Sequence, residues 1–303
     1  MALGDRVCWV DGRRLPVREA TVSVLAQSLQ RGTLVFDMFA VIDLPSGPHG
    51  LGAHEHTTRF LESAALMDLP VGYGADELLA VAGDLVRSNP GVDTVRMCAY
   101  WGEPSVDLVP VGDRPSVSVI AHAWSEIHPR GHGSDEPARL TVSGLRKVPP
   151  DIVPVQAKVA ASYAHAAVGK ARARAAGFDD VLLLDPTGEG LAESGTLSFF
   201  LVQDEVVRTA PLDIVLDGVT RRVLLDLAAD DGVPVQVGPL PRRLVDDCDE
   251  AFLTSTGRGV WPVGAIDDRT LPAPGPVSAR LGRRFHDVLR GRDPLAARWL
   301  QHL

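Results

Sequence analysis

Residues 154–168, PVQAKVAASYAHAAV, decide how the chain is read. Small residues continue from this stretch to Gly177, so we expect one long helix from about Val155 to Ala176 that ends at the glycine. Lys158 has small or apolar neighbours on both sides, where an ammonium is poorly solvated and the reactive neutral amine is favoured. Such an amine can bind a carbonyl carbon covalently. The alternative is an ordinary lysine whose stem lies on the helix while its ammonium stays in water.

The chain contains only three lysines, which limits the candidates for lysine-dependent chemistry. Lys147 precedes Val-Pro-Pro, and Lys170 lies on the basic helix face KARAR, so both are expected to lie in solvent. Lys158 is therefore the candidate.

Composition excludes several classes of function. A net charge of −9 and a pI near 5.5 disfavour nucleic-acid binding, which requires a concentrated positive surface. No apolar run is long enough to cross a bilayer and the first residues lack a signal pattern, so we expect a cytoplasmic protein that does not bind membranes. The three cysteines are far apart, and His54 and His56 point to different faces of a helix, so neither disulfides nor a metal site are expected.

The chain is long for a single core, and its elements fall into two groups. Before residue 121 we expect strands within 7–12, 21–26, 34–44, 94–101 and 116–124, and helices over 55–67 and 75–86. Beyond the Gly- and His-rich run EIHPRGHGSDEP we expect strands within 140–145, 180–185, 197–202, 233–240 and 250–256, and helices over 220–229 and 277–289. The sequence thus predicts an α/β (α+β) protein with a small domain 1–121, an interdomain loop 122–136 and a larger domain 137–303.

Polar residues in three places of the second domain are candidates for binding an anion or a cation. Val219 and Thr220 begin a helix after Gly218, where free backbone amides attract anions. The loop STGRG, residues 255–259, follows a strand and offers amides and a hydroxyl group. Glu193 precedes a buried strand, where a carboxylate requires a partner. Each place has an ordinary alternative: an empty helix start, a simple turn and a solvated glutamate.

Six stretches together resemble class IV (fold-type IV) aminotransferases, and most of all the branched-chain aminotransferases. They are SLQRGTLVFD, HEHTTRFLESA, VPVQAKVAASY, GFDDVLLLDPTGEGLAESG, LDGVTRRVLLDLA and DEAFLTSTGRGVWPV, in the family's order and spacing, so the resemblance covers nearly the whole chain. It implies a two-domain fold with pyridoxal 5′-phosphate bound at the domain interface, and an assembly of at least two identical subunits.

The resemblance also implies roles for individual residues. Lys158 would bind the cofactor covalently and move the proton between the substrate Cα and the cofactor C4′. Glu193 would pair with the pyridine nitrogen, and Tyr163 with the phenolic oxygen. The other cofactor contacts would be Arg59, Leu216, Val219, Thr220 and Thr256, and the substrate pocket would include Phe36, Arg96, Trp124, Ser255 and Gly257.

The chain also departs from the pattern of the branched-chain enzymes, at positions that concern the substrate rather than the cofactor. Arg31 stands where the family usually has tyrosine, and Asp37-Met38-Phe39-Ala40 where it has Glu-Gly-x-Arg. Thr94 also replaces a tyrosine, and Arg258 follows the STG loop. Our hypothesis is that Arg31 or Arg258 binds a substrate carboxylate, because a guanidinium forms paired hydrogen bonds with that group; the alternative is that both face solvent.

The leading functional prediction is amino transfer between an amino acid and a 2-oxo acid, with glutamate and 2-oxoglutarate as a plausible pair. Within the same fold, the alternatives are transfer on D-amino acids or R-configured amines, and lyase chemistry on aminodeoxychorismate. A protein that binds the cofactor without turnover is the alternative from a different class. The residues do not identify the substrate, its stereochemistry or the pathway.

Overall fold

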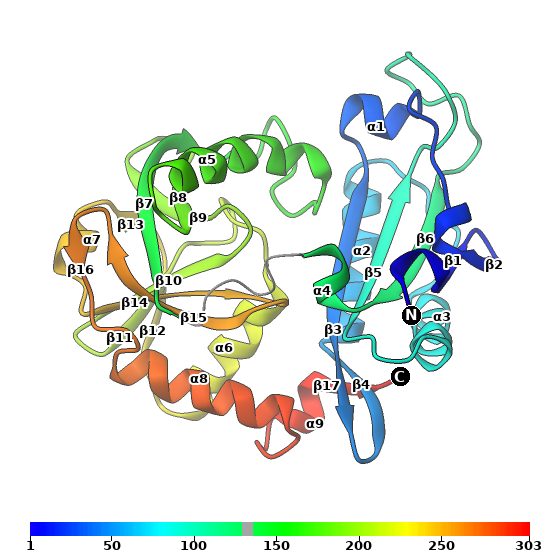
Figure 1. The fold of residues 1–303 in the computed structure, drawn as a ribbon. Helices are drawn as coiled ribbons and strands as arrows, with labels where there is room; N and C mark the ends of the chain where they lie inside the picture. The colour runs from blue at the N-terminus through cyan, green and yellow to red at the C-terminus, as the bar shows by residue number, and fades with distance from the viewer. Residues whose placement is uncertain (129–135) are drawn as a thin grey trace. The chain divides into compact units, whose positions relative to one another are not determined.

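The computed structural model describes residues 1–128 and 136–303, which form two compact units (Figure 1). The first unit comprises Met1–His132, Ala157–Ala161 and Leu289–Leu303, and the second comprises Gly133–Gln156 and Ser162–Val288. The short segment around Lys158 and the last fifteen or so residues therefore lie in the first unit, whereas the sequence places them in the second domain. Of the interdomain loop expected at 122–136, residues 129–135 lie outside the described residues, and Trp124–Ile127 form a short helix.

The described part of the first unit is built on a seven-stranded sheet in which every neighbouring pair is antiparallel. The strand order is β17-β4-β3-β5-β6-β1-β2. The strands are β1 (Val7–Val10), β2 (Arg13–Pro16), β3 (Val35–Leu44), β4 (Gly47–Leu51), β5 (Thr94–Tyr100), β6 (Ser116–His122) and β17 (Leu300–His302). Its helices are α1 (Gln27–Arg31), α2 (Ala53–Leu66), α3 (Ala75–Ser88), α4 (Trp124–Ile127) and α9 (Ala296–Trp299).

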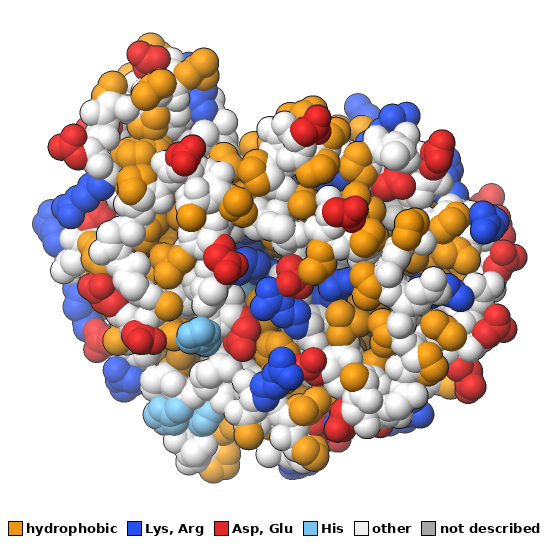
Figure 2. Space-filling model, turned by 180° about the vertical axis from the view of Figure 1, so that it is seen from behind, with side chains coloured by type: hydrophobic (Ala, Val, Ile, Leu, Met, Phe, Trp, Pro, Cys, Tyr) orange, Lys and Arg blue, Asp and Glu red, His pale blue; other side chains and the backbone are white. Residues whose placement is uncertain are grey.

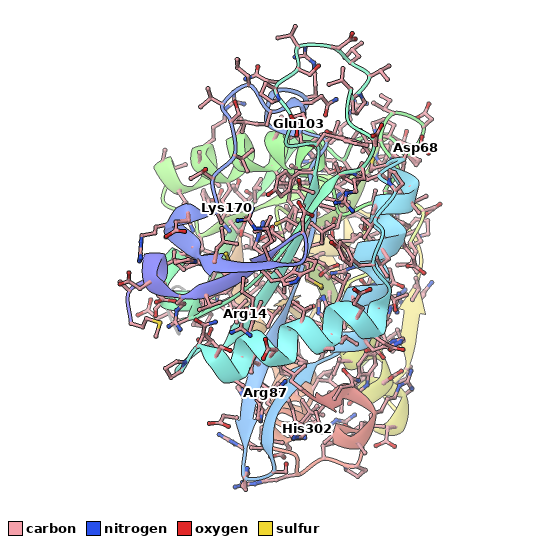
Figure 3. All side chains as sticks on the ribbon, turned by 90° about the vertical axis from the view of Figure 1, so that its right-hand side faces the viewer. Arg14, Asp68, Arg87, Glu103, Lys170 and His302 are labelled. Carbon is pink, nitrogen blue, oxygen red and sulfur yellow. The ribbon has the colours of Figure 1, made fainter. Side chains whose placement is uncertain are left out.

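The side chains of β3 alternate between the two faces of this sheet. Val35, Phe39 and Val41 are buried and alternate with half-buried residues, as the two-residue period of a strand requires. The buried positions face α2, which packs on β3 and carries the fully buried Phe60. Asp37 occupies one of these core positions, although it is a carboxylate. At the far edge of the sheet, Arg14 of β2 lies beside α3, where it forms an ion pair with Asp84 (Figure 3).

The described part of the second unit is built on a ten-stranded mixed sheet with the order β12-β11-β10-β14-β15-β7-β8-β9-β13, and β16 pairs with β15. The strands are β7 (Ala138–Arg146), β8 (Asp180–Leu184), β9 (Gly190–Ser194), β10 (Ser198–Gln203), β11 (Val206–Thr209), β12 (Val235–Val237), β13 (Leu240–Pro241), β14 (Glu250–Ser255), β15 (Gly259–Ile266) and β16 (Arg269–Thr270). Strand β7 is parallel to β15 and β8, and β11 is parallel to β12. The helices are α5 (Ala164–Ala175), α6 (Val219–Asp230), α7 (Leu244–Asp247) and α8 (Pro276–Leu289).

Every residue of β8 and β9 is buried, as are the first five residues of β10 and β14. Phe199, Leu201, Leu182 and Leu253 belong to the main core of this unit. This core fixes the ends of β9, β10 and β14, and several of the predicted site residues lie at those ends.

Glu250 at the start of β14 stabilises the first turn of α8. Its carboxylate accepts hydrogen bonds from the backbone N–H groups of Val277 and Ser278 at 2.8 and 2.9 Å. An acid placed there satisfies helix N–H groups that have no intrahelical partner. Gly275 is required next to it, because a Cβ atom at this position would lie 2.2 Å from the Glu250 carboxyl carbon.

Two predictions of secondary structure are wrong. Residues 21–25 are exposed and form no strand, because only Ala26 makes an isolated bridge, to Pro104. The helix expected from Val155 begins only at Ala160 as a short 3₁₀ turn, followed by α5. Residues 158 and 159 are instead hydrogen-bonded to β3. Val159 forms an isolated β-bridge with Val35, and the Phe36 N–H donates to the Lys158 carbonyl at 3.1 Å. Lys158 therefore lies outside the helix, on a short irregular segment hydrogen-bonded to β3.

The other predicted strands and helices are present, with shifts of a few residues at their ends. None of the helices in the described residues is both long enough and apolar enough to cross a membrane.

Candidate active site

Lys158 in the first unit lies beside an aromatic ring that also contacts an arginine. Its Nζ atom is 5.0 Å from the centroid of the Phe36 ring, and the Cζ atom of Arg96 is 4.4 Å from the same centroid. Phe36 and Arg96 belong to the β3–β5 pair, in which Met38 lies directly opposite Arg96. Cation–π contact helps to hold both cations over one ring. Three residues predicted for the site, Lys158, Phe36 and Arg96, are thus brought together.

Arg59 of α2 is buried and forms an ion pair with Asp37. Its Nε and Nη2 atoms donate to the two carboxylate oxygens at 2.8 and 2.9 Å. The helix also contacts the Lys158 segment, because the Lys158 N–H donates to the Ser63 hydroxyl at 2.9 Å. Arg59 therefore belongs to α2, and the backbone of Lys158 is hydrogen-bonded to the same helix.

Two further predicted residues of the first unit have other surroundings. Trp124 begins α4, and its ring stacks on that of His128 with centroids 3.6 Å apart and planes 6° apart. Arg31 is exposed on α1, where its Nη2 group donates to the Val106 carbonyl. None of the described contacts of Arg31 brings it to Lys158.

In the second unit, Glu193 of β9 pairs with Lys147. The Lys147 Nζ atom donates to Glu193 Oε1 at 2.5 Å, and the two side chains are only 14% and 11% exposed. The expectation that Lys147 lies in solvent is wrong. Burial works against the ammonium, but the charge and hydrogen bond of Glu193, and less strongly the Tyr163 phenol, raise the pKa of Lys147 above its ordinary value. The ion pair therefore holds the Glu193 carboxylate in a fixed position inside this unit.

His165, in the first turn of α5, lies close to this ion pair. Burial, followed by the positive charge of Lys147, lowers the pKa of His165, while Glu193 acts in the opposite direction. Both ring nitrogens are buried and have no hydrogen-bond partner among the described residues. A neutral imidazole therefore borders the Lys147–Glu193 pair.

The start of α6 meets the ends of β10 and β14 at a group of small polar residues. A Cβ atom at Gly218 would lie 2.9 Å from the Ser198 hydroxyl, and Ser198 is paired with Thr254 across the sheet. The hydroxyl oxygens of Thr220 and Thr254 are buried and find no partner in the described part of the chain. The first N–H groups of α6 have no intrahelical acceptors. Amides and hydroxyl groups collected at a helix N-terminus fit a phosphate group.

Thr256 and Gly257 lie in the turn between β14 and β15, closed by a hydrogen bond of 3.2 Å from the Arg258 N–H to the Ser255 carbonyl. The Arg258 guanidinium lies over the Trp261 ring, 3.4 Å from its centroid. Leu216 is half-buried just before α6. The second unit thus places Val219, Thr220 and Leu216 at one helix start, and Ser255, Gly257 and Arg258 in one strand turn.

Each unit, taken by itself, carries groups that suit an organic cofactor. The first unit offers an amine and a buried arginine, and the second offers a buried carboxylate and a helix start with hydroxyl groups suited to phosphate. These two mixed α/β units with such groups define an enzyme that uses an organic cofactor.

The comparisons with known proteins agree with this class. The sequence model of the family Amino-transferase class IV matches residues 34–266. The chain is 28% identical over 302 residues to a branched-chain-amino-acid aminotransferase of Pseudomonas aeruginosa, covering 99% of this chain and 98% of that protein. It is 31% identical over 260 residues to a probable branched-chain-amino-acid aminotransferase of Rickettsia bellii, covering 86% of each.

Solved structures are similar over almost the full length. A branched-chain aminotransferase of Thermoproteus uzoniensis, solved with norvaline, superposes with a TM-score of 0.92 at 28% identity and covers 98% of this chain and 99% of its own. The T.th. branched-chain amino acid aminotransferase, complexed with N-(5′-phosphopyridoxyl)-L-glutamate, has a TM-score of 0.90 at 31% identity, with 98% of each chain covered.

The chain belongs to the class IV aminotransferases of the branched-chain type. It is a pyridoxal-phosphate-dependent enzyme that moves an amino group between an amino acid and a 2-oxo acid. The predictions of family, fold class, reaction and cofactor are confirmed.

Several residues of these clusters are absent from the predicted set: Asp37, His56, Ser63, Lys147, His165 and Ser198. The spacing of His56, Arg59 and Ser63 along one helix, three and four residues apart, is a signal that places them on a common face. Lys147 carried a weaker signal, since it is one of only three lysines. Nothing in the local sequence of His165 or Ser198 distinguishes them.

Proposed function

We propose that the enzyme transfers the amino group of amino acids with apolar, branched side chains to a 2-oxo acid such as 2-oxoglutarate. The observation that carries this proposal is the sheet face beside Lys158. Phe36, Met38 and Cys98 lie on it together with a single guanidinium, that of Arg96. An apolar side chain packs on such a surface, while the one cation suits one carboxylate. The named relatives of similar length support the same substrate class.

In this proposal the predicted site residues would hold pyridoxal phosphate. Lys158 would bind the aldehyde, and Arg59, Val219, Thr220 and Thr256 would bind the phosphate. Tyr163 would donate to the phenolic oxygen, Leu216 would pack on the ring, and Glu193 would accept a hydrogen bond from the pyridine nitrogen. When bound, the cofactor supplies an electron sink for the charge that develops at the substrate Cα.

The protein's own groups then control the proton. The amine of Lys158 would remove the proton from the substrate Cα and return it at the cofactor C4′, on the other side of the nitrogen that joins the two carbons. Lys147 would hold the Glu193 carboxylate in place beside the ring nitrogen. Phe36 and Trp124 would shield the reacting atoms from water, and Ser255 and Gly257 would line the substrate pocket.

The carboxylate-anchor hypothesis now favours Arg258 over Arg31. Stacking on Trp261 fixes the plane of the Arg258 guanidinium, which reduces the entropy lost when an anion binds. Arg31 already donates to the Val106 carbonyl.

We also propose that the enzyme is at least a homodimer. Eight apolar side chains, between 45% and 76% exposed, gather on α1 and two loops of the first unit: Val22, Val24, Leu25, Leu29, Val106, Leu108, Val109 and Val111. The loops are bound together, since the Gln27 N–H donates to the Glu103 carbonyl and the Ser105 N–H to the Leu25 carbonyl. Figure 2 shows hydrophobic side chains on this projection, at the upper left, and Glu103 marks its loop in Figure 3. A patch of this kind is typical of a subunit interface.

The test is the absorbance of the purified holoenzyme with L-leucine, L-glutamate and D-glutamate added separately. We expect the cofactor band to shift with both L-amino acids, and borohydride treatment to leave a pyridoxyl label on Lys158. A shift with D-glutamate alone would favour the D-amino acid alternative, and pyruvate release from aminodeoxychorismate without an acceptor would favour the lyase. A Lys158→Ala variant that keeps full transfer activity would refute the proposal.

A further inference from the structure

One face of α2 carries three buried polar residues that bind to the rest of the first unit. His56, Arg59 and Ser63 are spaced so that they share one side of the helix, and they are 1%, 5% and 0% exposed. Polar side chains buried at this depth require partners. Their partners are Asp37 on β3 and the backbone of Lys158.

Asp37 has no exposed surface and accepts four N–H groups. Its Oδ1 atom accepts from His56 Nδ1 at 2.7 Å, from Arg59 Nη2 at 2.9 Å and from the Met38 backbone at 2.7 Å, and its Oδ2 atom accepts from Arg59 Nε at 2.8 Å. This is the side-on arrangement of a guanidinium on a carboxylate, which fixes the plane and direction of Arg59. The Nη1 group of Arg59 lies on the opposite edge of that plane and points away from Asp37.

The charges of this cluster are settled by its geometry. Burial alone would raise the pKa of Asp37, but the positive charge of Arg59 and the hydrogen bonds from Arg59 and His56 hold it well below its ordinary value. Burial lowers the pKa of His56, against the effect of Asp37, so His56 is neutral and donates its Nδ1 hydrogen. The cluster is therefore one anion and one cation, with a neutral imidazole beside them.

The same helix face holds the Lys158 backbone through Ser63. The Ser63 hydroxyl donates to the Arg59 carbonyl at 2.7 Å, one turn earlier, and accepts from the Lys158 N–H at 2.9 Å. On its other side, the Lys158 carbonyl accepts from the Phe36 N–H. The segment bearing the amine is thus held between α2 and β3 by its own peptide groups.

We propose that Asp37 and Ser63 are positioning residues: Asp37 orients Arg59 toward the cofactor phosphate, and Ser63 fixes the backbone from which the Lys158 amine projects. This inference rests on the roles proposed above for Arg59 and Lys158. It adds that a single helix face sets the distance between the group that binds phosphate and the group that binds the aldehyde. Neither Asp37 nor Ser63 touches the cofactor in this scheme.

The test of Asp37 compares two probes, pyridoxal phosphate and pyridoxal, by equilibrium dialysis against the apoenzyme. Asp37→Asn puts an N–H group against the Arg59 donors, so Arg59 must turn. We expect at least about a tenfold loss of affinity for pyridoxal phosphate, the size of a lost hydrogen bond between charged groups, with little change for pyridoxal. Asp37→Glu keeps the charge and is expected to restore the preference for the phosphorylated probe to within about threefold of the original.

A matched control separates positioning from stability. Asp180 is likewise fully buried, binds the N–H of the next residue and pairs with a cation, Lys170. Asp180→Asn is expected to destabilise the second unit but to leave the ratio of the two affinities unchanged. An unchanged ratio in a folded Asp37→Asn variant overturns the proposal for Asp37.

Ser63 is tested by the rate at which pyridoxal, followed by borohydride, labels Lys158. We expect Ser63→Ala to slow labelling about five- to tenfold, as expected for one lost hydrogen bond, without changing the affinity ratio. Ser278→Ala, which removes another buried hydroxyl, is the control and should label at the original rate. An unchanged labelling rate in Ser63→Ala overturns the proposal for Ser63. This test does not depend on whether the Asp37→Asn variant folds. If the unmodified enzyme gives no label on Lys158, the proposed function itself fails instead.

Discussion

Replacing Lys147 by methionine tests how much the buried ion pair between Lys147 and Glu193 contributes to the free energy of unfolding. The two side chains are 14% and 11% exposed, and their charged atoms are 2.5 Å apart. Removing one partner of a buried pair costs about 3–5 kcal/mol, because the remaining charge loses its compensation. We therefore expect Lys147→Met to lower the free energy of unfolding by that amount, measured by urea titration with tryptophan fluorescence. Lys147→Arg keeps the charge and should cost about 1 kcal/mol or less.

A double-mutant cycle isolates the pair. Lys147→Met with Glu193→Gln leaves no buried charge, so it should be less destabilised than the sum of the two single variants. The pKa of Lys147 is raised on folding, so its contribution is complete below the ordinary value of 10.5 and is lost as pH rises through the higher folded value. The difference between the original and Lys147→Met proteins should therefore shrink above about pH 10.5. A coupling energy below about 0.5 kcal/mol would refute this reasoning.

Three further outcomes follow from local geometry. Gly275→Ala should destabilise by about 3 kcal/mol in urea titration, because its Cβ would meet the carboxyl group beneath α8 at 2.2 Å, whereas Gly72→Ala, with no atom within 4 Å, should be neutral. Arg258→Ala should raise the KM for the 2-oxo acid about tenfold at a similar kcat, and an unchanged KM would exclude the anchor. Leu108→Lys should shift sedimentation toward the monomer, whereas Val237→Lys, also at an exposed apolar position, should leave the assembly intact.

The parts of the fold that the sequence predicts well are those in which local pattern and tertiary environment agree. Strand β3 is an almost continuous apolar run closed by a cluster of turn residues, and α2 and α3 have apolar residues at helical spacing, so the sequence predicts each of them with small errors at its ends. The prediction of a helix over residues 155–159 is wrong because the alanine-rich run that follows them favours a helix, while β3 offers these residues backbone partners that only the folded chain provides.

In the candidate site, too, the sequence predicts some residues well and others wrongly. Lys158, Phe36 and Arg96 were named from the sequence and meet around one ring. Lys147 was misjudged, since the partner that makes its burial acceptable is 46 residues away in the chain. Sequence spacing reports neighbours on one helix or strand, but it does not report which strand will supply a counter-charge.

A carboxylate at a core position of β3 has a consequence for engineering. Alternation along the strand would place an apolar residue where Asp37 stands, so a redesign of the core by hydrophobic pattern alone would choose leucine or valine there. Such a variant would leave the buried guanidinium of Arg59 without a counter-charge, which costs about 3–5 kcal/mol. We expect heat resistance and catalytic turnover to fall together at this position, unless Arg59 is replaced as well.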